Sequence, residues 1–329
     1  MRLMRCAGLL LGGLLTLALA SGCGTYSPRF AEAFVLPHVE ALSSGSDRVL
    51  LVPLRGTILL DGESGGFGPP GEGVLERVTR DLRRASRDPR VKAVVLHVDS
   101  PGGGVTASDV LRREVEAFRR TGRPVVVYAE SLNASGGYYV STAADRIVSN
   151  PTTVTGSIGV IAMYFNVEGL LGKVGVQETS FTSGPHKDMT GLFRRMTEDE
   201  TRIFQGIVDE LHGRFVDCVA SGRPKLSRER VKALADGRVY TASQALENGL
   251  VDQVGYLEDA VAAAQGLAGL QKRNIRLVSY ERVHKGLVVE ILNMQDGAAP
   301  APKSGLGLSM EVGNLLESRT PRFYYLWAP

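Results

Sequence analysis

Cysteine is scarce in this sequence, with three residues in 329, at positions 6, 23 and 218. Cys6 and Cys23 lie in and just after an apolar N-terminal segment. If that segment is removed and Cys23 is modified, Cys218 alone remains, which excludes an internal disulfide and a cysteine metal site. Cys218 falls within the apolar pattern of residues 215–219, which favours a buried structural thiol over a nucleophile.

A strong excess of charge of one sign is also missing. The net charge is +3, and loss of Arg2 and Arg5 with the N-terminal segment lowers it to about +1. Basic and acidic residues are interspersed, so nothing predicts the basic face that nucleic-acid binding needs. No motif calls for a cofactor or a metal. With 43% hydrophobic and 22% charged residues, the composition is that of a globular protein with a real core.

The sequence has no apolar run as long as the roughly 20 residues of a membrane span. Residues 7–20 form a run of fourteen, broken only by Thr16 and preceded by Arg2 and Arg5, as in the hydrophobic region of a secretory signal. Ala20-Ser21-Gly22-Cys23 resembles a bacterial lipobox, although leucine is commoner than Ala20 at that position. We predict a lipoprotein signal peptide at 1–22, a lipid on Cys23, and an anchor and tether at 23–47. The alternative is a plain signal peptide with an incidental cysteine. Either signal predicts that the folded domain lies outside the cytoplasm, in the cell envelope.

Short apolar runs alternate with helical patterns along the rest of the chain. Strands are expected at 49–54, 91–98, 124–128, 176–181 and 275–280, and helices at 74–82, 108–120, 197–221 and 241–249. Thr197 and Glu200 form a capping box. This order predicts an α/β fold with mostly parallel strands. We assign a domain to 48–294, and a Gly- and Pro-rich linker with an apolar tail to 295–329.

Four short motifs could carry chemistry, but each alone has a plainer explanation. Residues 99–104 (Asp-Ser-Pro-Gly-Gly-Gly) could offer amides to an oxyanion or form a tight turn; they lack the spacing and lysine of a phosphate loop. Ser135, followed by two glycines, could be a nucleophile or a helix N-cap. Lys187, in a Gly-Pro loop, is a base only if its pKa falls from about 10.4 towards neutrality; otherwise it is a solvated charge. Ser157 could orient an amine or sit in a turn.

Six motifs in order resemble one family. They are Ser-Pro-Gly-Gly at 100–103, Ala-Ser-Gly-Gly-Tyr-Tyr at 134–139, Thr-Gly-Ser-Ile-Gly-Val at 155–160, Ser-Gly-Pro-His-Lys-Asp at 183–188, Gly-Arg-Val-Tyr-Thr at 237–241 and Leu-Val-Asp at 250–252. Together they resemble the short, single-unit form of the signal peptide peptidase A family of serine–lysine peptidases. The resemblance covers about 49–255, and the ending at 320–326 also looks familial.

The resemblance implies a fold of repeated ββα units like Clp protease and crotonase. It implies Ser135 as nucleophile, Lys187 as general base, and Ser157 as the group that holds the lysine amine. Gly103 and Gly136 would donate amides to the oxyanion, with Gly102 as a substitute. It further implies peptide substrates such as spent signal peptides, and assembly into a homo-oligomeric ring.

Other interpretations stay open at this stage. A Ser-His-Asp triad could use His97 with Asp99, or His186. A crotonase-like acyl-thioester enzyme would share the fold and oxyanion site, but export argues against it because acyl-CoA is cytoplasmic. An inactive scaffold is a third class. The apolar tail at 323–329 could pack on its own domain or dock on a neighbouring subunit.

Overall fold

The computed structural model describes residues 47–60, 72–270, 275–280 and 323–327, all within one compact unit of the chain. The predicted signal peptide, Cys23 with its tether and the linker at 295–308 lie outside the described residues, and the predicted domain boundaries stay a prediction. None of the helices in the described ranges has the length and apolar character of a membrane span.

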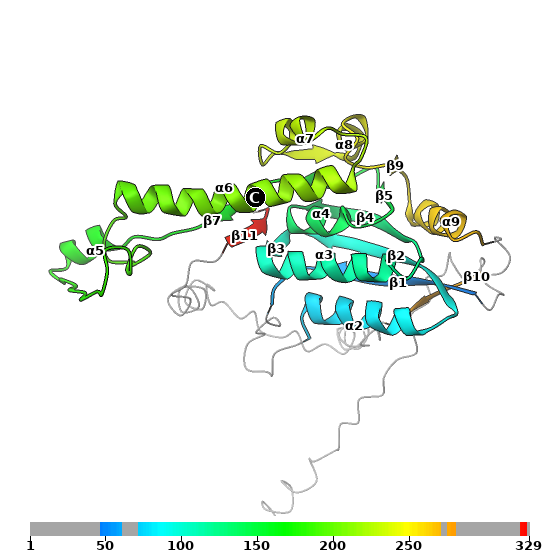
Figure 1. Cartoon of the computed structure of the whole chain (residues 1–329), viewed down its shortest axis with the longest axis horizontal. Coiled ribbons are helices and arrows are strands. Elements are labelled where there is room, and N and C mark those ends of the chain that lie inside the picture. The colour runs from blue at the N-terminus through cyan, green and yellow to red at the C-terminus, as the bar shows by residue number, and fades with distance from the viewer. Residues whose placement is uncertain (1–46, 61–71, 271–274, 281–322, 328–329) are drawn as a thin grey trace, which may run out of the picture. The chain divides into compact units, whose positions relative to one another are not determined.

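A parallel sheet forms the centre of the molecule (Figure 1). Its strands run in the order β10-β1-β2-β4-β5-β9, and every neighbouring pair is parallel. The strands are β1 (Asp47–Arg55), β2 (Val91–Ser100), β4 (Val125–Ala134), β5 (Arg146–Ser149), β9 (Gln253–Val254) and β10 (Ile275–Ser279). A parallel sheet needs cover on both faces, and this sheet separates two clusters of buried apolar residues.

Helices cover the two faces unequally. On one face, α2 (Val74–Arg87), α3 (Val105–Arg119) and α4 (Gly136–Ser141) lie side by side over the larger cluster (Figure 1). On the other face, α9 (Leu257–Leu267) packs Ala260, Val261 and Ala264 against the smaller cluster. The α/β class is therefore confirmed, and the succession β2, β3 (Gly102–Gly104), α3 is a ββα unit of the expected kind.

A second, smaller sheet lies at the carboxyl end of β2. Its order is β3-β11-β7, and β11 (Phe323–Leu326) runs antiparallel to both β3 and β7 (Ile161–Ala162). The strand β6 (Val154–Gly156) joins β4 in parallel and β8 (Val239–Thr241) antiparallel. Three short helices lie elsewhere in the described part of the chain: α5 (Glu168–Lys173), α7 (Arg228–Leu234) and α8 (Ala242–Glu247).

The longest helix, α6 (Glu198–Gly222), begins where its sequence predicts. Thr197 accepts a hydrogen bond from the Glu200 amide, and the Glu200 carboxylate accepts one from the Thr197 amide, which completes the predicted capping box. The strand predicted at 176–181 is wrong. No strand forms there, because Val176 and Phe181 are the only apolar residues of the segment and no strand pairs with it; Phe181 is 97% exposed.

Candidate active site

Ser135 occupies a strained turn between β4 and α4. Its backbone has φ 51° and ψ −115°, a conformation that costs a non-glycine residue about 1–3 kcal/mol. The turn is held from both sides: the Ser135 amide donates to Gly156 O at 2.8 Å, and the Tyr139 amide donates to Ser135 O at 2.8 Å. Ser135 holds the N-cap position, yet its hydroxyl makes no capping hydrogen bond. The N-cap alternative therefore loses its physical basis.

The glycine loop before α3 is fixed by Ser100 and Ile58. Ser100 Oγ donates to Gly56 O and accepts from the Gly102 amide, whose residue has φ 101°. On one side, the Gly104 amide donates to Ile58 O at 2.9 Å. Because successive amides of an extended strand point to opposite sides, the Gly103 amide faces the other way, towards β11.

The amides of Gly103 and Gly136 lie around one small space. A Cβ placed on Gly136 would lie 3.0 Å from Gly103 N, and one placed on Gly102 would lie 2.5 Å from Gly136 N. Neither position has room for a side chain. Two donors that converge on a space beside a serine hydroxyl have the form of an oxyanion site.

The carbonyl of Tyr325 lies in this space. In β11, Tyr325 pairs with Gly103 and Leu326 with Gly102. A Cβ on Gly102 would lie 2.0 Å from Tyr325 O, and one on Gly136 would lie 3.0 Å from it. The Trp327 amide donates to Pro101 O at 2.9 Å, which extends the pairing by one residue. An extended segment of the chain itself thus lies close to Ser135, with its Tyr325 carbonyl next to Gly102 and Gly136.

The Tyr325 side chain fills an aromatic pocket and is fully buried. Its ring stacks on Tyr139 at 4.9 Å between centroids and lies 4.6 Å from Phe215. Its hydroxyl donates to Leu211 O at 2.9 Å. Of the two alternatives for the tail, the structure shows packing on its own domain.

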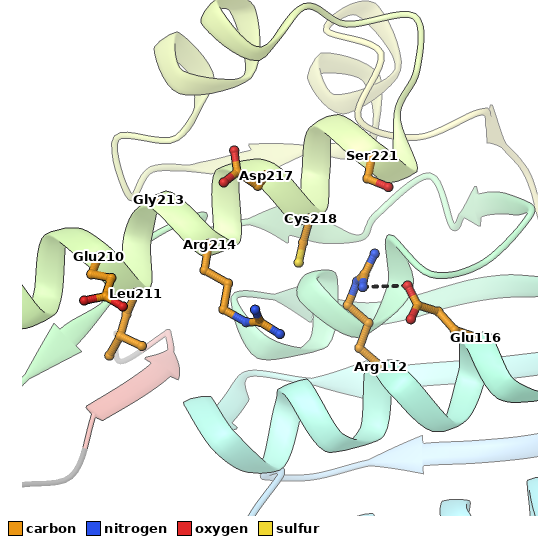
Figure 2. Close-up of a pocket in the computed structure, with 9 residues that line it drawn as sticks. All are labelled: Arg112, Glu116, Glu210, Leu211, Gly213, Arg214, Asp217, Cys218 and Ser221. Carbon is orange, nitrogen blue, oxygen red and sulfur yellow. Dashed lines mark ion pairs between the residues drawn. The ribbon is translucent and has the colours of Figure 1, made fainter.

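A cleft of about 550 Å³ opens behind this pocket, between α3 and α6 (Figure 2). Cys218 lies on its wall and is half-buried, and its thiol donates to the Tyr139 hydroxyl at 3.2 Å. That hydroxyl in turn donates to Asp109, which also binds Arg214. Burial alone would raise the pKa of Asp109, but the hydrogen bonds from Tyr139 and Arg214 outweigh it, and the pKa is lowered. Cys218 is a structural thiol here, and the network fixes the ring beside Tyr325.

Ser157 lies next to Ser135 because their strands are paired. Ala134 of β4 is opposite Gly156 of β6, so the two serines follow paired residues. Ser157 also has a left-handed backbone, φ 48°, and its amide donates to Arg238 O at 2.8 Å. Its side chain is largely buried. The structure brings Ser135, Ser157, Gly103 and Gly136 into one place.

Lys187 is not part of this group. It lies in the excursion, residues 163–197 between β7 and α6, which Figure 1 shows reaching away from α4 along with α5. Lys187 is exposed, and within the described ranges its ammonium makes no hydrogen bond or ion pair. Arg194 fixes the next residue, donating to Asp188 O at 2.7 Å and to both Glu200 oxygens at 2.7 and 2.8 Å. The hydrogen bond from Arg194 lowers the pKa of Glu200 to about 2.

The histidine alternatives find no serine partner among the described hydrogen bonds. His97 Nε2 lies 2.9 Å from Glu130 Oε2, and its other nitrogen lies 3.5 Å from Arg55. Burial lowers the pKa of His97. His186 is partly exposed and lies 3.8 Å from Glu200. Within the same ranges no group of acidic, histidine and cysteine side chains could hold a metal ion.

Sequence reasoning missed Arg194, Tyr139 and Tyr325 as parts of the site. Arg194 carries no signal in the sequence beyond one charge among many. Tyr139 and Tyr325 stood in motifs quoted for the resemblance, but only the packing of β11 shows that their rings stack.

Comparison with known proteins agrees with the family indicated by the motifs. The model of peptidase family S49 matches residues 117–271, which include Ser135, Ser157 and Lys187 but not Gly103. A Synechocystis protein named as a protease is 38% identical over 65% of this chain and 76% of its own length. The chain belongs to peptidase family S49. A family S49 relative from Enterococcus faecium, named as a signal peptide peptidase SppA, is 40% identical over 68% of this chain.

The chain spans only part of the length of several relatives. It covers 64% of the Enterococcus protein and smaller shares of two relatives named Protease 4. Among solved structures, a ClpP1 mutant from Listeria monocytogenes matches with a TM-score of 0.41 and 17% identity, over 66% of this chain and 95% of that chain. The family model and the sequence relatives confirm the resemblance to signal peptide peptidase A at the level of the family.

Proposed function

We propose that this family S49 protein is a membrane-anchored serine endopeptidase that cleaves extended apolar peptides with a Ser135–Lys187 dyad. The observation that carries the proposal is the position of β11. An extended chain pairs with β3, and the Tyr325 carbonyl lies between Gly102 and Gly136, beside Ser135. A substrate peptide that took the same place would present a scissile carbonyl to the serine hydroxyl.

The chemistry is acyl transfer to Ser135. Neutral Lys187 takes the proton from Ser135 Oγ as this oxygen bonds to the peptide carbonyl carbon. The amides of Gly103 and Gly136 stabilise the negative oxygen that forms. Lys187 then gives the proton to the leaving amine, and the C–N bond breaks. Water attacks the resulting ester, with Lys187 again as the base, and releases the acid and free Ser135. Ser157 holds the lysine amine in place.

A second copy of the chain supplies Lys187 in this proposal. Two features support it. The Ser135 group lacks a base within the described ranges, and Lys187 is carried away from it by the excursion. The excursion also exposes large apolar side chains, among them Phe181 at 97% and Val174 at 65%, which are expected to be covered in an assembly. A head-to-tail contact that gives each copy its neighbour's lysine forms a ring when its rotation closes, and we propose such a ring here.

The substrate class follows from the way β11 binds. Strand addition to β3 uses backbone hydrogen bonds, which any extended chain can make and a folded one cannot. The aromatic pocket around the Tyr325 ring favours a large apolar side chain. Spent signal peptides and other unfolded apolar segments have both properties.

Location outside the cytoplasm, on a lipid at Cys23, is part of the proposal. Its support is the sequence Ala20-Ser21-Gly22-Cys23 after a fourteen-residue apolar run. Mass spectrometry of the mature N-terminus should find acylated Cys23 as the first residue, and Cys23→Ser should accumulate as unmodified precursor. A mature terminus without Cys23 would remove the anchor and leave the peptidase proposal intact.

Hydrolysis of an apolar fluorogenic peptide, together with covalent labelling by a serine-directed fluorophosphonate, tests the function. We expect turnover by the wild-type protein and a label on Ser135, with both absent in Ser135→Ala. Labelling of another serine would contradict the assignment of the nucleophile. A folded wild-type protein that neither cleaves nor is labelled would favour an inactive scaffold. Thioester turnover without labelling of Ser135 would favour the crotonase-like alternative.

A further inference from the structure

Ser108 is a buried serine whose hydroxyl has no partner. It lies in the first turn of α3, is 0% exposed, and its Oγ has no hydrogen-bond partner among the described residues. A serine inside a helix commonly donates to the carbonyl four residues before it. Ser141 does so, with its Oγ 2.9 Å from Gly137 O. A buried hydroxyl without a partner costs about 1–3 kcal/mol, so the position calls for an explanation.

The unpartnered oxygen lies at the candidate oxyanion site. A Cβ placed on Gly136 would lie 2.5 Å from Ser108 Oγ, 3.0 Å from Gly103 N and 3.0 Å from Tyr325 O. The serine hydroxyl, the glycine amide and the bound carbonyl thus surround a single point on the face of Gly136. The glycine leaves this space open.

Close packing of α3 against α4 explains why residue 108 is small, but it does not explain a hydroxyl. Alanine would fill nearly the same volume and would leave no polar atom unpaired. Ser149, on β5, is the other fully buried serine with an unpartnered hydroxyl in the described ranges, and it lies in the core of the sheet rather than at the glycine loop. Ser149 therefore serves as a matched control.

We propose that the Ser108 hydroxyl is a third donor of the oxyanion site, which donates to the substrate oxygen as it becomes negative. The inference rests on the proposed function and adds a residue to it. In this proposal, the amides of Gly103 and Gly136 donate hydrogen bonds to the carbonyl oxygen of the bound substrate before the reaction. The oxygen shifts and gains charge when the carbon becomes tetrahedral, and the Ser108 proton, with no other partner to give up, then stabilises it. No bond to Ser108 forms or breaks.

The experiment compares Ser108→Ala with Ser149→Ala in the full chain. Turnover of an apolar peptide gives kcat and KM, and the rate of fluorophosphonate labelling of Ser135 gives a second readout, since the phosphoryl oxygen occupies the oxyanion site. For Ser108→Ala we expect kcat and the labelling rate to fall together by about 10- to 100-fold with KM nearly unchanged, because one oxyanion donor is worth up to about 10²–10³ in kcat. Ser149→Ala should match the wild type in both assays.

The alternatives give different results. If the wild-type protein is active and Ser108→Ala is equally active, the inference about Ser108 is wrong and the proposed function stands. A fall in kcat that came with a lower midpoint of thermal unfolding, or that Ser149→Ala shared, would assign Ser108 a packing role and overturn it as well. A folded wild-type protein that is inactive in both assays would overturn the proposed function, and the inference with it.

Discussion

The surroundings of Ser135 and those of Lys187 are built in opposite ways. Ser135 is 1% exposed and lies in a strained turn that the Gly156 carbonyl and the Tyr139 amide both hold. Lys187 is exposed, in an excursion whose apolar side chains face solvent. If the two residues form the proposed dyad, the surroundings of the nucleophile are complete within one chain, whereas the exposed surroundings of the base call for a covering surface.

The largest expected effect comes from the dyad itself. If the two regions form one catalytic unit, Ser135→Ala and Lys187→Ala should each lower kcat by about 10⁴-fold or more, and the double variant should be no worse than either, because residues that act as a unit are not additive. Peptide turnover with matched protein concentrations measures this. Retention of most activity by Lys187→Ala or Lys187→Arg would show that the lysine is not the base.

A smaller loss is expected when the hydrogen bonds that Arg194 makes beside Lys187 are removed. Arg194→Ala removes the hydrogen bonds to Asp188 O and Glu200 that fix the residue next to Lys187. We expect kcat to fall about 10-fold, with the core unchanged, because the base is then less well positioned. Arg195→Ala is the matched control, since Arg195 is highly exposed and its contact with Glu168 is 3.7 Å long. Equal losses of kcat in the two variants would mean that the positive charge of this segment, rather than the positioning of Lys187, affects the reaction.

The role of the groove beside Ser135 can be tested by weakening the binding of β11, which occupies it. Tyr325→Ala empties the aromatic pocket and weakens the tail's hold beside Ser135. The KM for an added peptide should then fall about fivefold or more, because a larger fraction of the protein has a free groove. Tyr324→Ala, one residue earlier on the opposite side of β11, should change KM little. An unchanged KM in Tyr325→Ala would indicate that added peptides bind elsewhere.

The smallest effect concerns acid. The pKa of Glu200 is lowered to about 2 by its hydrogen bond from Arg194, below the ordinary value near 4.3. A carboxyl group whose pKa is lowered by folding stabilises the folded form at pH values above its ordinary pKa. This contribution is lost as the pH falls towards 2. The protection of amides around residues 188–200, measured relative to their intrinsic exchange rates at each pH, should therefore decrease as the pH falls from about 4 to 2, and less so in Glu200→Gln. Equal pH profiles for both proteins would contradict the pairing.

Much of the sheet could be predicted from the sequence because its signals are local. The runs at 49–54 and 91–98 became β1 and β2, and Thr197 with Glu200 began α6 as predicted. The segment at 176–181 has a weaker signal, with four polar residues between Val176 and Phe181, and it did not form a strand. The strand at 124–128 likewise proved longer, reaching Ala134, because β6 pairs with its end.

The site shows the same limit. The family resemblance grouped Ser135, Ser157, Gly103 and Gly136, and the pairing of β4 with β6 explains why Ser135 and Ser157 meet. The place of Tyr325 beside Gly103 depends on residues more than two hundred positions apart, and no local pattern encodes it. The motifs did not predict the separation of Lys187 from Ser135, because they give residue types and not the distance between them.

Mixing two inactive variants tests the central claim most directly. Ser135→Ala retains Lys187, and Lys187→Ala retains Ser135, so subunits of the two kinds should complement each other if the dyad spans two copies. After mixed refolding in equal amounts, we expect about a quarter of wild-type activity, the share of contacts in which an intact serine meets an intact lysine. Co-assembled variants that remain as inactive as either parent would contradict a lysine supplied by a second copy.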